Sequence, residues 1–390
     1  MISVADALSA LFALVEPLDP EQVSLRDAYG RVLASDVTAN RDQPPFAASA
    51  MDGYAVRGAD VREGATFTVV GEAAAGHAFT NDVPRGAAAR IFTGAPLPRG
   101  TDHVIIQEDV TRDGDIITLQ ANFDAGPYVR PAGADFRKGD IITAPRVLSS
   151  ADAALLASMN VPTISVTRKP QVAIIATGDE LVQPGETPNP DQIIASNSYG
   201  LAALIAASGA DARMLPIARD NEASLKMTLE LASDADLIVT IGGASVGDHD
   251  IVGKVAADMG LDRSFYKVAM RPGKPLMAGK IGNAALIGLP GNPVSAMVCG
   301  HIFVVPVIKA LLGLSQAPAK TQTAILDHDL KANGPREHYM RAQVDAGKVN
   351  VFDRQDSALL TVLADANCLM KRPPNEGPLT KGASVEIVHI

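Results

Sequence analysis

The feature that most constrains this chain is an uninterrupted apolar run that ends in a glycine-rich segment. The run Leu237–Ile241 (LIVTI) is followed by Gly242–Gly247 (GGASVG) and then by Asp248-His249-Asp250. Short apolar runs without alternation are typical of strands that are buried on both faces of a parallel sheet. A glycine-rich turn after such a strand presents backbone N–H groups that can bind a phosphate. The segment therefore predicts an α/β sheet with an anion site at its edge.

Two acidic residues, Asp248 and Asp250, come directly after this turn. A carboxylate beside a phosphate site would repel the phosphate unless a divalent cation lay between them. Mg²⁺ is commonly held by one or two protein carboxylates together with oxygens of the phosphate ligand. The pattern therefore predicts phosphate chemistry with Mg²⁺ as cofactor.

The composition narrows the class of protein. At 390 residues the chain should form two or more domains, and its 47% hydrophobic and 20% charged residues are typical of folded proteins. The net charge of −10 argues against a nucleic-acid partner, because nucleic-acid binding needs a basic surface. The two cysteines, Cys299 and Cys368, are far apart and outside any zinc-binding spacing. With no signal peptide and no membrane-spanning run in the sequence, we expect a cytoplasmic protein that does not bind membranes.

Changes in the pattern of apolar and polar residues along the chain predict how its domains are organised. Helices are expected over residues 2–15 and from the cap at Ser149 to Met159. Between them, short apolar runs separated by glycines predict a mostly-β insertion with strands near 67–70, 104–106 and 116–119. From residue 172 to 312 strands alternate with helices, which predicts a doubly wound parallel sheet. In the remaining segment apolar and polar residues alternate again, which is typical of the strands of a small β domain.

The predicted fold is α/β plus β, with a doubly wound, mostly parallel α/β domain, a helical linker, an inserted β lid and a small C-terminal β-barrel. Ligands of open α/β sheets bind at the carboxyl ends of the strands, so the site is expected there. The predicted boundaries are 1–43 with 138–168 for the linker domain, 44–137 for the lid domain, 169–315 for the α/β domain and 316–390 for the C-terminal domain.

Acidic residues follow several of the predicted parallel strands and could converge at this edge. Each has a purely structural interpretation when taken alone: Asp179 could be a turn residue, and Asp220 before Asn221 could be a helix cap. Taken together they favour a metal site or a general acid–base site. The residues are Asp179, Glu180, Asp220, Asp248 and Asp250.

A basic cluster in the same region suits an anionic ligand. It comprises Lys267, Arg271 and Lys274, the last two within Arg-Pro-Gly-Lys-Pro, where the prolines restrict the loop. The alternation of Tyr266, Val268 and Met270 predicts a strand, so Lys267 and Arg271 should share a face. The structural alternative is a solvated loop with exposed charges.

Residues 243–247 also match the G-x-S-x-G nucleophile elbow of α/β hydrolases. An elbow serine should lead into a helix, whereas here Asp-His-Asp follows. His301 lies on an apolar helix and is a poor candidate for a triad base. The hydrolase interpretation is therefore disfavoured.

Several short motifs occur in a fixed order along the chain. They are PPF at 44–46, SAMDGYA at 49–55, TGAPLP at 93–98, ATGDEL at 176–181, GGASVG at 242–247, PGKP at 272–275 and LPGNP at 289–293. In this order they closely resemble the molybdopterin molybdenumtransferases, the family of bacterial MoeA and the gephyrin E domain, from about Ile2 to Ile390.

The resemblance implies that adenylylated molybdopterin and molybdate bind, that the pyrophosphate linkage is cleaved with Mg²⁺, that AMP leaves, and that molybdenum enters the pterin dithiolene. It also implies a homodimer whose site lies between the α/β domain of one subunit and the lid domain of the other. The adenylyltransferase that supplies the substrate and molybdoenzyme-maturation proteins are expected as further partners.

The resemblance, together with the glycine-rich loop, also assigns site residues. Glu180 and Asp250 are the expected Mg²⁺ ligands, and Asp52 would position the metal or a water from across the dimer. Arg271 stands where some relatives carry lysine, which replaces a point charge by a planar fork. The catalytic set is Asp52, Glu180, Asp220, Asp250, Lys267 and Arg271; the substrate-binding set is Thr93, Arg130, Asp135, Gly242, Gly243, Ser245, Gly247, Lys274, Pro290, Pro293 and Ser357.

Two other functions compete with this one. The related molybdopterin adenylyltransferase shares the α/β fold but usually lacks the β insertion and the terminal β domain. A gephyrin-like scaffold would not need the acids, yet Asp52, Glu180, Asp220 and Asp250 are all present. The sequence therefore favours the molybdenumtransferase.

Overall fold

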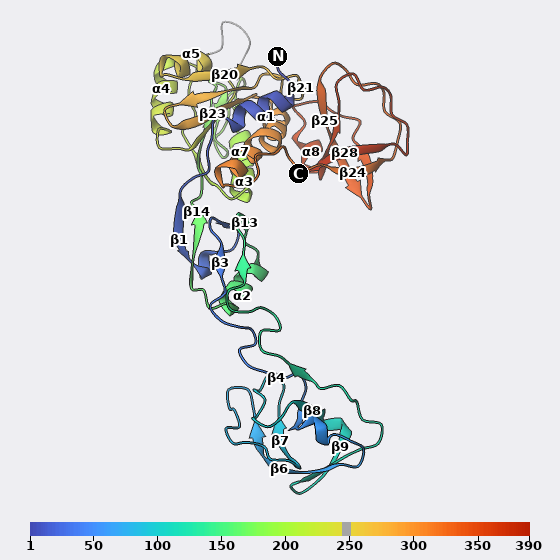
Figure 1. The fold of residues 1–390 in the computed structure, drawn as a ribbon. Helices are drawn as coiled ribbons and strands as arrows, with labels where there is room; N and C mark the ends of the chain where they lie inside the picture. The colour runs from blue at the N-terminus through green and yellow to red at the C-terminus, as the bar shows by residue number, and fades with distance from the viewer. Residues whose placement is uncertain (244–250) are drawn as a thin grey trace.

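The computed structural model describes residues 1–243 and 251–390, which form an elongated molecule (Figure 1). The α/β domain and the C-terminal domain lie side by side at one end, the linker domain lies in the middle, and the lid domain lies at the other end. The chain runs out to the lid and returns beside its outgoing path. The pairs that join the two passages are β3 (Val37–Thr38) with β12 (Ile141–Ile142) and β4 (Ala48–Ser49) with β11 (Val129–Arg130).

The middle of the molecule is a small antiparallel sheet covered by one helix. Its strand order is β1-β14-β2-β13, with β1 (Pro20–Ser24), β14 (Thr163–Thr167), β2 (Val32–Leu33) and β13 (Arg146–Val147). Helix α2 (Ser150–Ser158) begins where predicted, because the Ser149 hydroxyl accepts a hydrogen bond from the Asp152 N–H at 3.2 Å. The Asp152 carboxylate accepts the Ser149 N–H in return, which completes a capping box.

The lid is a six-stranded sheet with the order β8-β5-β7-β6-β10-β9. The predicted strands are confirmed, and Phe67, Ile105 and Ile117 bury their side chains in its core. Gly53 is required where β5 passes β8, because a Cβ there would lie 1.9 Å from the Ile105 carbonyl oxygen. The strands are β5 (Gly53–Val56), β6 (Thr66–Ala73), β7 (Ala87–Ile91), β8 (His103–Ile106), β9 (Val110–Asp113) and β10 (Ile116–Leu119).

The α/β domain contains a six-stranded, mostly parallel sheet with the order β18-β15-β19-β23-β22-β20. The predicted run Leu237–Ile241 is strand β19; all five of its residues are buried, and it pairs in parallel with β15 and β23. Two antiparallel strands, β22 and β20, extend the sheet beyond β23. The other strands are β18 (Asp211–Met214), β15 (Gln171–Ala176), β23 (Ala284–Leu289), β22 (Met277–Ile281) and β20 (Asp262–Tyr266).

Helices cover both faces of this sheet (Figure 1). One face packs on α4 (Glu222–Leu231) and α5 (Ile251–Asp258). The other face packs on α1 (Val4–Phe12), α3 (Asn197–Ala207) and the helical stretch Pro293–Leu311. Helix α1 falls in the predicted linker range, but Leu8 and Leu11 are buried in the α/β core.

The stretch Pro293–Leu311 comprises α6 (Pro293–Cys299), a π-helical turn at Gly300–Val304 and α7 (Val305–Leu311). By length and composition it is apolar enough to cross a membrane. However, 78% of its most apolar window is buried inside the protein, so its hydropathy is that of a core helix.

The C-terminal domain is the predicted small barrel. Its five strands close in the order β25-β26-β24-β28-β27 and back to β25, around a core that includes Val349, Val351 and Met370. The elements are β24 (Gln322–Leu326), β25 (Glu337–Asp345), β26 (Lys348–Val351), β27 (Cys368–Arg372), β28 (Ser384–His389) and the short helix α8 (Leu360–Ala364).

The strand predicted across Tyr266, Val268 and Met270 is wrong. Strand β20 ends at Tyr266, and Lys267 has a φ of +71°, which turns the chain out of the sheet. The following two-residue strand β21 (Met270–Arg271) leaves the α/β sheet and pairs in parallel with β25 of the barrel. Lys267 and Arg271 therefore do not share one face of one strand.

Candidate functional site

The carboxyl ends of the parallel strands open onto a cavity of about 990 Å³. It lies where the sequence predicts a ligand site, because β15, β19 and β23 all end there. Residues from the three strand-end loops line it. These are Thr177, Gly178 and Glu180 after β15, Gly242 and Gly243 after β19, and Pro290, Gly291, Asn292 and Pro293 after β23.

The loop after β15 folds the Glu180 side chain back towards the cavity. Gly178 has a φ of +146°, and a Cβ at this position would lie 2.3 Å from the Glu180 carboxylate. The buried Thr177 hydroxyl donates a hydrogen bond to the Ile241 carbonyl oxygen at 3.2 Å. The loop is thereby fixed to the end of β19, and it leaves room for the carboxylate.

The turn after β19 is tightly packed against its neighbours. Gly242 and Gly243 have φ values of +87° and +65°, and a Cβ at Gly243 would lie 2.3 Å from Val252 Cγ2. Only glycine fits this backbone without displacing α5. The predicted residues Ser245, Gly247 and Asp250 lie outside the described residues, as do Asp248 and His249.

Among the described residues, three acidic side chains line the cavity, namely Glu180, Asp220 and Glu222. Asp220 is also part of a turn: its N–H donates to Asp179 Oδ1 at 3.2 Å, and the Asp179 N–H donates to Asp220 Oδ2 at 3.4 Å. Within residues 1–243 and 251–390, no three His, Cys, Asp or Glu side chains gather closely enough to hold a metal by themselves. A metal here would therefore need ligand oxygens as well.

Lys254 is a cavity residue that the sequence analysis missed. It is the one Lys or Arg among the described lining residues, and its ammonium pairs with Glu222 Oε1 at 2.5 Å. This pair raises the pKa of Lys254 and lowers that of Glu222, chiefly through the shared hydrogen bond. No local sequence signal marks Lys254, because its place at the cavity depends on the packing of α5 against α4.

The predicted basic cluster is not gathered at this cavity. Pro275 lines the cavity, whereas Lys267, Arg271 and Lys274 are not among its lining residues. Lys267 Nζ lies 5.1 Å from the centre of the Tyr266 ring. The loop that carries Arg271 and Lys274 nevertheless packs closely on α6, the helix that begins at the cavity, because a Cβ on Gly273 would lie 2.4 Å from Cys299 Sγ.

The loop after β23 connects the cavity to the C-terminal domain. Asn292 Nδ2 donates to Ser357 Oγ at 3.0 Å, and the Val294 N–H donates to the Ser357 carbonyl oxygen at 3.0 Å. Ala358 lines the cavity, so the predicted Ser357 lies immediately beside it. Asn197 at the start of α3 fixes the other side of the loop by donating to the Gly291 carbonyl oxygen at 2.7 Å.

Four predicted residues lie in the lid domain, at the opposite end of the molecule from this cavity (Figure 1). Asp52 Oδ1 accepts hydrogen bonds from the Thr93 N–H and the Thr93 hydroxyl, both at 2.7 Å. These bonds hold the pKa of Asp52 below its usual value. Arg130 lies in β11, and the Asp135 N–H donates to the Gln43 carbonyl oxygen. One chain alone does not bring these residues to the sheet edge.

Family models match nearly the whole chain. Residues 2–160 match the MoeA N-terminal region (domains I and II), residues 173–310 match a probable molybdopterin binding domain, and residues 323–390 match the MoeA C-terminal region (domain IV). The molybdopterin molybdenumtransferase of Nostoc sp. is 35% identical over 100% of this chain and 94% of its own length. That of Haemophilus influenzae is 35% identical over 95% and 94% of the two chains.

Solved structures agree with the sequence matches. A crystal structure of a molybdopterin biosynthesis MoeA protein from Pyrococcus horikoshii has a TM-score of 0.85 at 30% identity, covering 100% of this chain and 99% of that one. A second one from the same species has a TM-score of 0.86 at 27% identity over the whole of both chains. The predicted fold class and the predicted family are thus both confirmed. The chain belongs to the molybdopterin molybdenumtransferases, which are transferases of molybdenum cofactor biosynthesis.

Proposed function

We propose that this transferase takes adenylylated molybdopterin and molybdate as substrates, uses Mg²⁺, and releases AMP as it forms the molybdenum cofactor. The observation that carries the proposal is the cavity at the sheet edge, where a glycine turn, two acids from separate loops and one lysine come together. Such a site can hold a phosphate, a divalent cation and an anionic leaving group next to one another.

The glycine turn is suited to the phosphate of the substrate. Gly242 and Gly243 both have positive φ values; the Gly242 N–H donates to the Leu289 carbonyl oxygen at 3.0 Å, so the Gly243 N–H is the one that we expect to bind a phosphate. Lys254 adds a positive charge on the next helix. We expect the lysine to exchange its Glu222 partner for phosphate oxygens when the substrate binds.

The acids are suited to a hard cation. Glu180 and Asp220 supply only oxygen donors, which Mg²⁺ prefers, and the substrate phosphates would complete its coordination. Bound Mg²⁺ would neutralise charge on the phosphate that is cleaved. Asp250 remains a predicted ligand. Asp250→Asn should weaken the dependence on Mg²⁺, and an unchanged Mg²⁺ titration would remove Asp250 from the metal site.

The lid residues support a homodimer in which each site is shared. Asp52 is hydrogen-bonded by Thr93 and kept ionised, yet it lies in the domain remote from the cavity. A two-fold dimer would allow the lid of one subunit to cover the sheet edge of the other. Asp52 could then orient the metal or a water at the phosphate.

The proposal is tested by measuring AMP release from adenylylated molybdopterin with molybdate and Mg²⁺. Glu180→Gln should leave the melting temperature unchanged and abolish AMP release. Glu230→Gln, on the exposed side of α4, is the matched control and should behave like wild type. Near-normal turnover by Glu180→Gln would remove Glu180 from the mechanism. If the protein instead adenylylates molybdopterin with ATP in the absence of molybdate, it is an adenylyltransferase.

A further inference from the structure

Arg219 precedes Asp220 in the connection between β18 and α4, and its side chain reaches across to the loop that follows β15. Its Nη1 donates hydrogen bonds to two carbonyl oxygens of that loop, those of Asp179 at 3.1 Å and Leu181 at 3.2 Å. These two residues flank Glu180, which lines the sheet-edge cavity. One arginine nitrogen therefore holds the backbone on both sides of Glu180.

The two contacts are compatible because the chain is extended at this point. The short strand β16 (Leu181–Val182) begins here and pairs in parallel with β17 (Ile193–Ile194). Carbonyl groups two residues apart in an extended chain point to the same side, and the one between them points to the opposite side. The Glu180 carbonyl oxygen accordingly accepts the Ile193 N–H at 2.8 Å. Three successive carbonyls thus have a donor, two of them from Arg219.

The backbone of Arg219 is anchored as well. Its N–H donates to Ser224 Oγ at 3.0 Å, in the first turn of α4. The carbonyl oxygen of Ala218, the residue before it, accepts the Gly178 N–H at 3.1 Å. The loop after β15 and the loop before α4 are therefore joined by backbone contacts and by the Arg219 side chain. Each of these two loops carries one acid of the cavity.

Arg219 does not pair with the acids around it. An arginine next to carboxylates commonly forms a bidentate ion pair. In the part of the chain that the structure describes, neither Glu180 nor Asp220 is in an ion pair, and the Arg219 side chain donates only to carbonyl oxygens. Two carboxylates that line one cavity without a paired cation repel each other, which favours the binding of a cation between them.

We propose that Arg219 is a positioning residue of the transferase, which fixes Glu180 and Asp220 as a preformed pair of cation ligands by holding the backbone on both sides of Glu180. The inference rests on the proposed use of Mg²⁺, and it adds a residue that touches neither the metal nor the substrate. Mg²⁺ requires short bonds in near-ideal geometry, so its binding depends on how firmly the two carboxylates are held.

The competing explanation is that Arg219 binds the substrate itself. Within residues 1–243 and 251–390 its Nε and Nη2 make no hydrogen bond, so these donors are available to a ligand. Binding of an anion by the planar fork would not survive replacement by lysine. The two carbonyl contacts are made by one nitrogen, so a lysine ammonium with its three donors can replace them. Arg219→Lys therefore separates the two explanations.

Hydrogen exchange tests the positioning without the reaction. In the full-length, metal-free protein, mass spectrometry follows the backbone amides of residues 178–183 and of Ile193. Arg219→Met should speed their exchange at least about tenfold, as expected for the loss of hydrogen bonds from a charged donor. Arg219→Lys should exchange like wild type. Arg213→Met is the matched control and should also exchange like wild type, because Arg213 donates to a carbonyl oxygen too, that of Leu231, but contacts neither cavity loop.

A Mg²⁺ titration of AMP release tests the consequence for the site. In Arg219→Met the Mg²⁺ concentration for half-maximal release should rise at least about tenfold. The rate at saturating Mg²⁺ and the KM for adenylylated molybdopterin should stay close to wild type. Arg219→Lys and Arg213→Met should titrate like wild type. A mere loss of stability would lower the amount of active enzyme and leave the half-saturating Mg²⁺ concentration unchanged.

Three results would overturn the inference. They are unchanged loop exchange in Arg219→Met, an unchanged half-saturating Mg²⁺ concentration in Arg219→Met, and a loss in Arg219→Lys equal to that in Arg219→Met. Each of them leaves the wild-type titration intact. Failure of the proposed reaction looks different, because wild-type AMP release would then not depend on Mg²⁺ at all, and the role of the acids as cation ligands would fall with it.

Discussion

Two inactive variants should restore each other's AMP release in mixed dimers if the site is shared between subunits. Asp52→Asn damages the lid, and Glu180→Gln damages the sheet edge at the opposite end of the same subunit. In a mixed dimer, the site formed by the intact lid of one subunit and the intact sheet edge of the other carries no mutation. The second site of that dimer carries both mutations.

The expected activity follows from this arrangement. Random association of equal amounts of the two variants gives mixed dimers in about half of the molecules, and each mixed dimer has one intact site out of two. The mixture should therefore release AMP at about one quarter of the wild-type rate, against a background near zero for each variant alone. Co-expression with two affinity tags, followed by tandem purification, would raise the figure to about one half.

The control mixes Asp52→Asn with Thr93→Val. Both mutations lie in the lid, at the two ends of one hydrogen-bonded pair, so every site of the mixed dimer contains a damaged lid. No activity should return. If the Asp52→Asn and Glu180→Gln mixture also stays at background while mixed dimers are present, the site is not shared between subunits.

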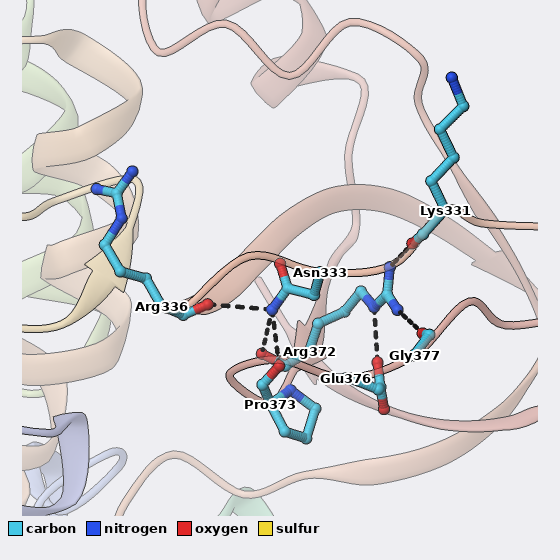
Figure 2. Close-up of polar contacts among 7 residues, drawn as sticks. All are labelled: Lys331, Asn333, Arg336, Arg372, Pro373, Glu376 and Gly377. Atoms are coloured by element: carbon cyan, nitrogen blue, oxygen red, sulfur yellow. Dashed lines mark hydrogen bonds and ion pairs between the residues drawn. The ribbon is translucent and has the colours of Figure 1, made fainter.

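Three further predictions concern stability. Gly243→Ala should lower the free energy of unfolding by about 1–3 kcal/mol, because its Cβ would lie 2.3 Å from Val252 Cγ2 at a positive φ; a urea titration like that of wild type would contradict this. Arg372→Met should lower the free energy of unfolding by about 3 kcal/mol in the same assay, because it leaves the Glu376 carboxylate and the carbonyl oxygens of Lys331 and Gly377 without their donor (Figure 2). The control Lys381→Met should change the free energy of unfolding little. Burial lowers the pKa of His301 to about 4, so between about pH 6.5 and 4 the unfolded chain binds a proton at this residue that the native state does not bind. The melting temperature of the wild type, measured by calorimetry, should therefore fall as the pH drops through this range, and that of His301→Gln should fall less steeply. Equal slopes for the two proteins would contradict this.

The parts of the fold that the sequence predicted are those that depend on local pattern. Strand β19 was predicted because burial on both faces favours an apolar run without alternation, and four of its five residues are apolar. Helix α2 was predicted from the cap at Ser149, and the structure adds Asp152 as the second half of a capping box. Each of these signals is contained in a short window of sequence.

The parts that could not be predicted depend on distant contacts. Val268 and Met270 are buried and alternate like a strand, but they belong to a connection between two sheets, with a left-handed residue at Lys267. Nothing local indicates that Arg271 pairs with His338, which lies 67 residues later in the chain. The same applies to Lys254, whose place at the cavity depends on the packing of α5 against α4.

The pairing of β21 with β25 ties the border of the sheet-edge cavity to the C-terminal barrel. The Glu337 N–H donates to the Ala269 carbonyl oxygen at 3.0 Å, and Arg336 Nη1 donates to that of Met270 at 3.3 Å, so this short stretch is anchored to the barrel by its own backbone. Only a few residues further on, Pro275 borders the sheet-edge cavity. The cavity thus has part of its border next to a segment that the backbone of the barrel holds in place.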